Sequence, residues 1–151
     1  MATLTGLTFL SLSNTQIADA APLAALTALT ELYLMNTQIA DAAPLAALTA
    51  LQILVLEGTR ITDLHPLSGL PSLKLLDLSH THVANLSPLA ILNNLETLVL
   101  KGVPKADLSP LSALIANGLK IEGKPVPKAL ARKPRASARR PPPPAPSGDG
   151  A

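Results

Sequence analysis

The chain contains no cysteine and no tryptophan, and its 151 residues include one phenylalanine and one tyrosine. Without cysteine there can be no disulfide framework, no thiolate metal site and no cysteine nucleophile. Hydrophobic residues nevertheless make up 48% of the chain, and leucine alone fills about a fifth of the positions. The core must therefore be aliphatic and assembled from many small, similar contributions, which is typical of a repeat protein.

Long apolar runs are also missing. A membrane-spanning helix needs about 18 consecutive apolar residues, whereas polar residues interrupt this chain every few positions. The first residues, from Met1 to Leu4, lack the basic start, the unbroken apolar stretch and the cleavage site of a secretory signal. We therefore expect no transmembrane segment and a cytoplasmic protein, while secretion or an origin as part of a longer protein stays open.

Charge is distributed unevenly along the chain. Residues 1–123 contain five Lys/Arg and nine Asp/Glu, which gives a net charge of −4. Residues 124–151 contain seven Lys/Arg and one Asp, which gives a net charge of +6. Residues 124–151 also contain eight of the 15 prolines and only two large aliphatic side chains. Because such a segment cannot bury enough apolar surface to fold, we predict a folded, acidic domain over 1–123 and a disordered, basic, proline-rich tail over 124–151.

The first four fifths of the chain consist of a repeat with a constant length of 22 residues. Five full units and a partial sixth begin at Leu4, Leu26, Leu48, Leu70, Leu92 and Leu114. Within a unit, leucine recurs three, six and eight positions after the first, as at Leu26, Leu29, Leu32 and Leu34. The first two units share an identical stretch, residues 14–29 and residues 36–51, which indicates a direct duplication.

A threonine column is followed two residues later by an aliphatic residue, and its members are Thr15, Thr37, Thr59 and Thr81. These threonines lie where the chain leaves the strand, so we expect their hydroxyls to bond buried backbone groups in a ladder of the kind that asparagine usually forms. We predict that Thr37→Val and Thr59→Val each cost roughly 1–3 kcal/mol. In the fifth unit Val103 takes the threonine position and Lys105 the aliphatic one, which predicts that the array is ending.

An acidic or amide column lies three residues before a Pro-Leu pair, and its members are Asp19, Asp41, Asp63, Asn85 and Asp107. Proline is favoured at the start of a helical turn because it presets φ and lacks the donor that such a turn leaves unpaired. We expect these side chains to cap a short 3₁₀ or helical turn, with Ser87 and Ser109 as alternative caps.

Residues 4 to about 123 match the leucine-rich repeat pattern L-x-x-L-x-L-x-x-N-x-L, with Thr in place of Asn. The unit length and the D-x-x-P-L ending resemble the short repeats of bacterial internalins and of SDS22-like proteins. The resemblance implies an α/β repeat solenoid: a horseshoe with one short parallel strand per repeat and short 3₁₀ or helical turns on the outer side. It also implies surface binding for internalins and phosphatase regulation for SDS22-like proteins, without deciding between them.

In each strand the leucines of L-x-L point into the core and the intervening residues point outwards. Three stripes are therefore predicted on the concave inner face, and they are Phe9, Glu31, Ile53, Leu75 and Thr97; Ser11, Tyr33, Val55, Asp77 and Val99; and Ser13, Met35, Glu57, Ser79 and Lys101. An exposed apolar patch often marks a contact surface. The predicted partner-binding residues are Phe9, Glu31, Tyr33, Met35, Ile53, Val55, Glu57, Leu75, Asp77 and Lys101. Packing between neighbouring strands is the alternative reason for apolar residues here.

Catalytic and metal-binding chemistry is not indicated. His80 and His82 have H-x-H spacing, and both rings would point outwards from an extended backbone, but neighbouring repeats supply no further ligand. Residues 1–123 have no Gly-rich phosphate loop, no G-x-S-x-G motif and no paired carboxylates beyond the acidic column. We therefore expect no enzyme activity, no cofactor, no metal ion and no small-molecule substrate.

The tail offers two weak binding signals. Arg140, Pro143 and Pro146 satisfy the R-x-x-P-x-x-P pattern of an SH3 ligand, and the basic residues would bind nucleic acid or an anionic membrane without sequence preference. The leading hypothesis is a non-catalytic module that binds a protein partner. Two alternatives stay open: a fragment of a larger leucine-rich repeat protein without independent function, because no capping element precedes the first repeat, and association driven by the tail.

Overall fold

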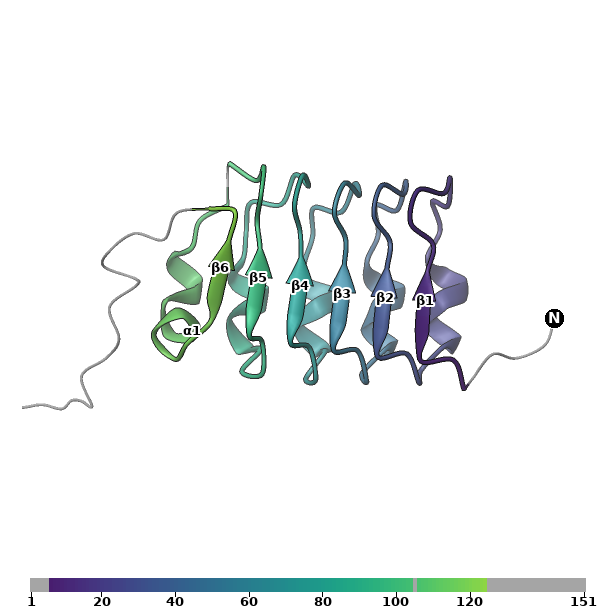
Figure 1. Ribbon diagram of the computed structural model, residues 1–151, viewed down its shortest axis with the longest axis horizontal. Helices are drawn as coiled ribbons and strands as arrows, with labels where there is room; N and C mark the ends of the chain where they lie inside the picture. Colours follow the sequence, from purple (N-terminus) through teal and green to yellow (C-terminus); the bar gives the residue numbers. More distant parts are fainter. Residues whose placement is uncertain (1–5, 105, 125–151) are drawn as a thin grey trace, which may run out of the picture.

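The computed structural model describes residues 6–104 and 106–124. Six short strands form one parallel sheet whose spatial order follows the sequence (Figure 1). The strands are β1 (Phe9–Ser11), β2 (Glu31–Tyr33), β3 (Ile53–Val55), β4 (Leu75–Asp77), β5 (Thr97–Val99) and β6 (Lys120–Glu122). The predicted solenoid, with one parallel strand per repeat, is confirmed.

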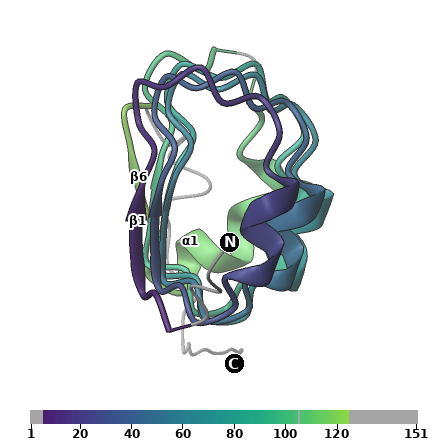
Figure 2. The same ribbon diagram turned by 90° about the vertical axis from the view of Figure 1, so that its right-hand side faces the viewer.

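Short helices occupy the return path of each unit. They are the 3₁₀ helices η1 (Ala21–Ala25), η2 (Ala43–Ala47), η3 (His65–Gly69), η4 (Ser87–Ile91) and η5 (Ser109–Leu111), followed by the α-helix α1 (Ser112–Ala116). Figure 2 looks along the stack and shows the strands as one wall and the 3₁₀ helices as the opposite wall, with α1 drawn between the two walls. None of the helices in the described part of the chain has the length and apolar character needed to cross a membrane.

The core lies between the two walls and consists mainly of leucine, with some Ala, Ile and Val. Leu32, Leu54 and Leu76, the middle residues of β2, β3 and β4, are fully buried and pair with one another in register from unit to unit. One unit alone cannot enclose its leucines, whereas a unit with a neighbour on each side shares one continuous core with both.

The acidic column lies one residue before the N-cap of each 3₁₀ helix and binds the first helical N–H. In each unit, the backbone N–H two residues after the Asp or Asn donates to its Oδ1 at 2.9 or 3.0 Å. The N–H groups of His65 and Ser109 stabilise the charged carboxylates, so the pKa values of Asp63 and Asp107 lie below the ordinary value of 3.8. Ser87 is not the cap, because its hydroxyl donates to Asn85 Oδ1 at 2.6 Å.

The threonine column is buried and hydrogen-bonded from the second unit onwards. The hydroxyls of Thr37, Thr59 and Thr81 donate to the carbonyl three residues earlier, at 2.9, 2.7 and 2.6 Å. The hydroxyls therefore bond buried backbone groups, as expected, and each bond stays within its own unit. Val103 fills the same position in the fifth unit and is equally buried, with its N–H 3.2 Å from the Leu100 carbonyl oxygen.

A second column at the strand exits has positive φ values. Its members are Asn14, Asn36, Gly58, His80 and Gly102, with φ of 63°, 57°, 71°, 56° and 71°. His80 has left-handed backbone, so the condition under which both histidine rings would point outwards, an extended backbone, is not met at that residue. Side chains also stack along this column: the amide of Asn36 lies over Gly58, and the imidazole of His80 lies over Gly102.

This column was not predicted from the sequence. Asparagine and glycine tolerate left-handed backbone better than other residues, and their recurrence at the same position of successive units was the available signal.

The last unit departs from the regular spacing. Leu98 of β5 pairs with Ile121 of β6, whereas an unchanged period would pair it with Lys120, so the final unit carries one additional residue. Here α1 follows a shortened 3₁₀ helix and buries Leu114 and Ile115 against the core. Lys105 and the tail from residue 125 lie outside the described residues, so the interpretation of Lys105, the boundary near residue 123 and the character of the tail stay predictions.

Candidate binding face

The side of the sheet turned away from the short helices is called the open sheet face. In the described part of the chain no other element covers it (Figure 2). The strand registers place the first two predicted stripes in rows and add one residue to each. The rows are Phe9, Glu31, Ile53, Leu75, Thr97 and Lys120, and Ser11, Tyr33, Val55, Asp77, Val99 and Glu122.

The third stripe follows directly after the strands. Successive backbone bonds link it across the repeats, from Asn14 N–H to the Met35 carbonyl and from Asn36 N–H to the Glu57 carbonyl. The same bonds continue to Ser79 and Lys101 in the next two units. The Met35 N–H also donates to the hydroxyl of Ser13 at 3.2 Å. The residues predicted for this face are therefore brought together, whereas their binding role stays a prediction.

An aromatic pair stands at the β1 end of the face. The ring centroids of Phe9 and Tyr33 are 5.4 Å apart, and the rings are tilted by 42°. Phe9 is 53% exposed, and within the described residues only one other large hydrophobic side chain, Ile91, has comparable exposure. The Tyr33 hydroxyl donates to Glu31 Oε2 at 3.0 Å. Partial burial, this hydrogen bond and the charge of Glu31 raise the pKa of Tyr33 above 10.0, so the phenol is a neutral donor near pH 7.

The middle of the face is flatter and partly occupied by internal contacts. Ile53 and Leu75 are direct partners across β3 and β4, and both are half-buried. Val55 is only 7% exposed, so strand packing accounts for much of its apolar character. Asp77 accepts the Ser79 N–H at 2.9 Å through Oδ1. The surface available to a partner therefore comes mainly from Phe9, Tyr33 and the Ile53–Leu75 pair.

Charge is graded along the open sheet face. Carboxylates lie over β2, β3 and β4, at Glu31, Glu57 and Asp77, whereas the β5–β6 end carries Lys101 together with the opposite charges of Lys120 and Glu122. Lys120 Nζ is 3.2 Å from Glu122 Oε2, and both side chains are exposed. Such exposed pairs contribute little stability, but a graded surface fixes the orientation of a charged partner.

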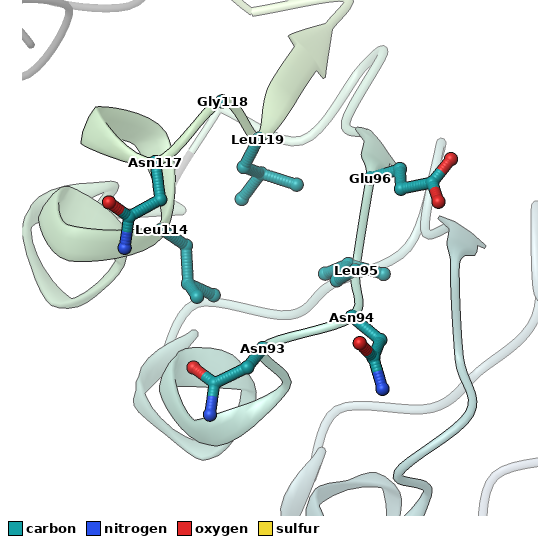
Figure 3. Close-up of a pocket in the computed structure, with 8 residues that line it drawn as sticks. All are labelled: Asn93, Asn94, Leu95, Glu96, Leu114, Asn117, Gly118 and Leu119. Carbon is teal, nitrogen blue, oxygen red and sulfur yellow. The ribbon is translucent and has the colours of Figure 1, made fainter.

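Two hollows lie away from this face. One, of about 410 Å³, opens beside the starts of β5 and β6, where leucine side chains lie between the carboxamides of Asn93, Asn94 and Asn117 (Figure 3). It lies where the repeat spacing changes, and it was not predicted from the sequence. The other, of about 440 Å³, is lined by His80, His82 and the turn from Gly102 to Pro104. Among the residues the structure describes, no group of three or more His, Asp or Glu is placed to hold a metal ion.

The tail residues Arg140, Pro143 and Pro146 lie outside the described residues. Their role as a peptide ligand therefore stays a prediction.

Comparison with known proteins gives a consistent result. Residues 5–47 and 49–90 match the model of a family described as leucine-rich repeats, two copies. An internalin C2 of Listeria monocytogenes is 40% identical, with a TM-score of 0.74 over 78% of this chain and 52% of that chain. The internalin inlF of the same organism is 33% identical, with a TM-score of 0.73 over 78% of this chain and 34% of that one. The resemblance to internalin-like repeats is confirmed.

A more distant structural neighbour is the LRIM1/APL1C complex, with 27% identity and a TM-score of 0.56 over 64% of this chain and 19% of the matched chain. The chain thus spans about half, or less, of the length of these proteins. A search of curated protein sequences gives no match.

Proposed function

Because this chain belongs to the leucine-rich repeat family, we propose that it is a non-catalytic module that binds a protein partner through its open sheet face. The observation that carries the proposal is the pairing of the exposed Phe9 with Tyr33 on a sheet surface that no other described element covers. Aromatic side chains at the centre of a contact supply large apolar area at low entropic cost. The location in the cytoplasm stays a prediction.

The charged side chains of the open sheet face indicate which kind of protein partner it would bind. Carboxylates over β2–β4 favour a partner whose basic groups meet the middle of the face, and Lys101 favours an acidic group beside β5, since Lys120 is already paired with Glu122. Between these charges the partner would offer apolar side chains to Phe9, Tyr33 and the Ile53–Leu75 pair. That one structural neighbour was solved as a complex, LRIM1/APL1C, also supports a protein partner.

The decisive experiment is affinity capture from a lysate of the source organism at physiological salt. Three forms are compared: the full chain, the double variant Tyr33→Glu with Ile53→Lys, and the control Ile91→Lys. Ile91 ends η4 on the opposite wall and is 64% exposed, so the control adds a lysine at an apolar surface position outside the face. Circular dichroism must first show that all three forms are folded.

We expect a protein that is retained by the full chain and by Ile91→Lys and lost with the double variant. If every captured protein survives the double variant, the open sheet face is not the binding site and the proposal fails.

The basic tail is the alternative binding site, and the salt dependence of binding distinguishes it from the open sheet face. Binding through the basic residues of 124–151 would fall by orders of magnitude between about 50 and 200 mM salt and would ignore Tyr33→Glu with Ile53→Lys. Binding centred on apolar side chains would change far less over the same range. A steep salt dependence without face dependence would therefore transfer the function from residues 1–123 to the tail.

A further inference from the structure

The β1 edge of the sheet carries a row of backbone groups without partners in the described chain. The groups of β1 that face β2 belong to alternate residues: the Thr8 carbonyl accepts from Glu31, and the Leu12 N–H donates to Tyr33. Since successive residues of a strand direct their N–H and C=O groups to opposite sides, those of Phe9 and Ser11 point to the open edge. One unit further on, the Tyr33 carbonyl at the equivalent position accepts a bond from β1.

The same end exposes apolar core residues. Leu10, Leu12 and Ile17 are only partly buried, whereas the residues at the same positions of the second unit are fully buried. The end of the solenoid therefore presents both an unpaired strand and an incompletely covered aliphatic surface.

The β1 edge also lacks the protection that free sheet edges usually carry. Natural edges are blunted by charged residues or proline or by a covering element. Within residues 6–20 the only charged side chain is Asp19, which is committed to capping η1. At the other end, Lys120 and Glu122 flank the single apolar residue of β6, and α1 packs beside it (Figure 1). The two ends of the sheet therefore differ in their capacity to pair.

The contact between the first two repeats indicates which kind of surface can cover the β1 end of the sheet. Residues 36–51 repeat residues 14–29 letter for letter, and the second unit buries its β1-facing side against a leucine-rich repeat. A second copy of the chain supplies such a repeat. Because the β6 end carries charges and α1, the complementary surface on the second copy is its own β1 end, which is uncharged and therefore free of repulsion.

We infer that β1 pairs with β1 of a second copy of this chain, antiparallel and centred on Leu10, in a two-fold symmetric dimer. The edge-directed groups of Phe9 in one copy would then bond those of Ser11 in the other, and Leu10 would meet its own equivalent. A two-fold axis perpendicular to the sheet keeps both open faces on one side. The dimer thus joins the two sheets and places two Phe9–Tyr33 pairs side by side, which gives a bivalent surface.

The test is the molar mass of the full chain in solution, measured by sedimentation over a range of micromolar concentrations, together with amide exchange at Phe9 and Ser11. Ser11→Pro removes the edge-directed N–H but none of the bonds between β1 and β2. Ser11→Ala is the matched control, because it keeps the backbone donor. We expect a dimer for the wild type and for Ser11→Ala, with slow exchange at both amides, and a dissociation constant at least about tenfold higher for Ser11→Pro.

Other results overturn the inference. A monomer with fast exchange at both amides means that the edge stays open. A monomer with slow exchange means that another part of the same chain covers it. A dimer that withstands Ser11→Pro in a folded protein uses a different surface, and open-ended oligomers mean head-to-tail stacking of β6 on β1. If Ser11→Pro does not fold, the exchange rates and mass of the wild type and Ser11→Ala still decide between pairing and no pairing.

Discussion

Residues 14–29 and 36–51 have the same sequence but different surroundings. Both segments fold alike: η1 and η2 start at the same position, with Pro at the beginning and nearly identical backbone angles at their N-caps. Their burial differs, because Ile39 and Thr37 are buried whereas Ile17 is partly buried and Thr15 is exposed. Local sequence therefore sets the conformation of a repeat, and the neighbouring repeats set how much that conformation contributes to stability.

The most direct test of this comparison is a matched pair of truncations, Ile39→Ala and Ile17→Ala. We expect the first to lower the free energy of unfolding by about 2–5 kcal/mol, because it leaves a cavity in a closed core. The second should cost about 1 kcal/mol or less, because its side chain keeps part of its exposure to solvent. Both are measured by urea unfolding in the Ser11→Pro background, so that dimer formation does not bury Ile17.

Equal losses for the two isoleucine variants would contradict the dependence on neighbours. A larger loss for Ile17→Ala in the wild-type background than in the Ser11→Pro background would show in addition that the second copy covers this end.

A neighbouring repeat also affects the cost of replacing a glycine. Gly102 has φ of +71°, and a Cβ there would collide with the imidazole of His80 from the preceding repeat. We expect Gly102→Ala to cost about 1–3 kcal/mol. Gly69→Ala is the control, since a Cβ at Gly69 meets nothing within 4 Å. Thermal unfolding of both variants measures the difference in their stability. Combining Gly102→Ala with His80→Gly should recover part of the stability that Gly102→Ala loses. Full additivity of the two changes would show that the contact has no energetic effect.

A smaller difference in stability is expected between two threonine variants, Thr37→Val and Thr15→Val. In Thr37→Val the buried Leu34 carbonyl loses the hydroxyl that donates to it at 2.9 Å, so we expect a loss of about 1–3 kcal/mol. Thr15 makes the same bond to Leu12 at 2.6 Å but is exposed. Water replaces its hydroxyl, and Thr15→Val should be nearly neutral. Denaturant unfolding of the two variants measures both changes in stability. A neutral Thr37→Val would mean that this column does not depend on the hydroxyl, as Val103 already suggests for the fifth unit.

The contact between the first and second repeats should also appear in the titration of Tyr33, the only tyrosine in the chain. Burial, the hydrogen bond to Glu31 and the charge of Glu31 raise the pKa of Tyr33 above its ordinary value of 10.0, so the phenolate forms at higher pH than in a free tyrosine. Phe9→Ala reduces the burial, and Glu31→Gln removes the charge and weakens the acceptor. Each should therefore lower the pKa of Tyr33 towards its ordinary value. Ultraviolet absorbance during alkaline titration measures the shift directly. A Tyr33 pKa at or below the ordinary value in the wild type would contradict the packing of Phe9 against it.

Periodicity in the sequence, together with the resemblance to leucine-rich repeats, predicted the solenoid, the positions of β1 to β5 and their rows on the open sheet face. These follow from alternation within L-x-L and from a fixed period, and both are local properties. The capping role of the acidic column was likewise predictable, because Asp and Pro act on their own turn.

The features that were not predicted involve contacts between units. The stacking of Asn36 over Gly58 and of His80 over Gly102 joins residues from successive repeats. The additional residue before β6 is accommodated where α1 packs on the last closed repeat. Val55 is buried by its neighbours although its strand position faces outwards.

The amino-acid pattern alone was enough to define the repeat unit: its strand, its capped 3₁₀ turn and the side of the sheet on which each residue lies. Those choices depend on bonds and dihedral angles within a single unit. Contacts between units, in contrast, set which copies of an identical segment are closed off from solvent, which carbonyls depend on a threonine, and which end of the sheet is left with unpaired backbone groups. Burial and pairing are shared between units, so two identical sequences acquire different energies when one of them has a single neighbour.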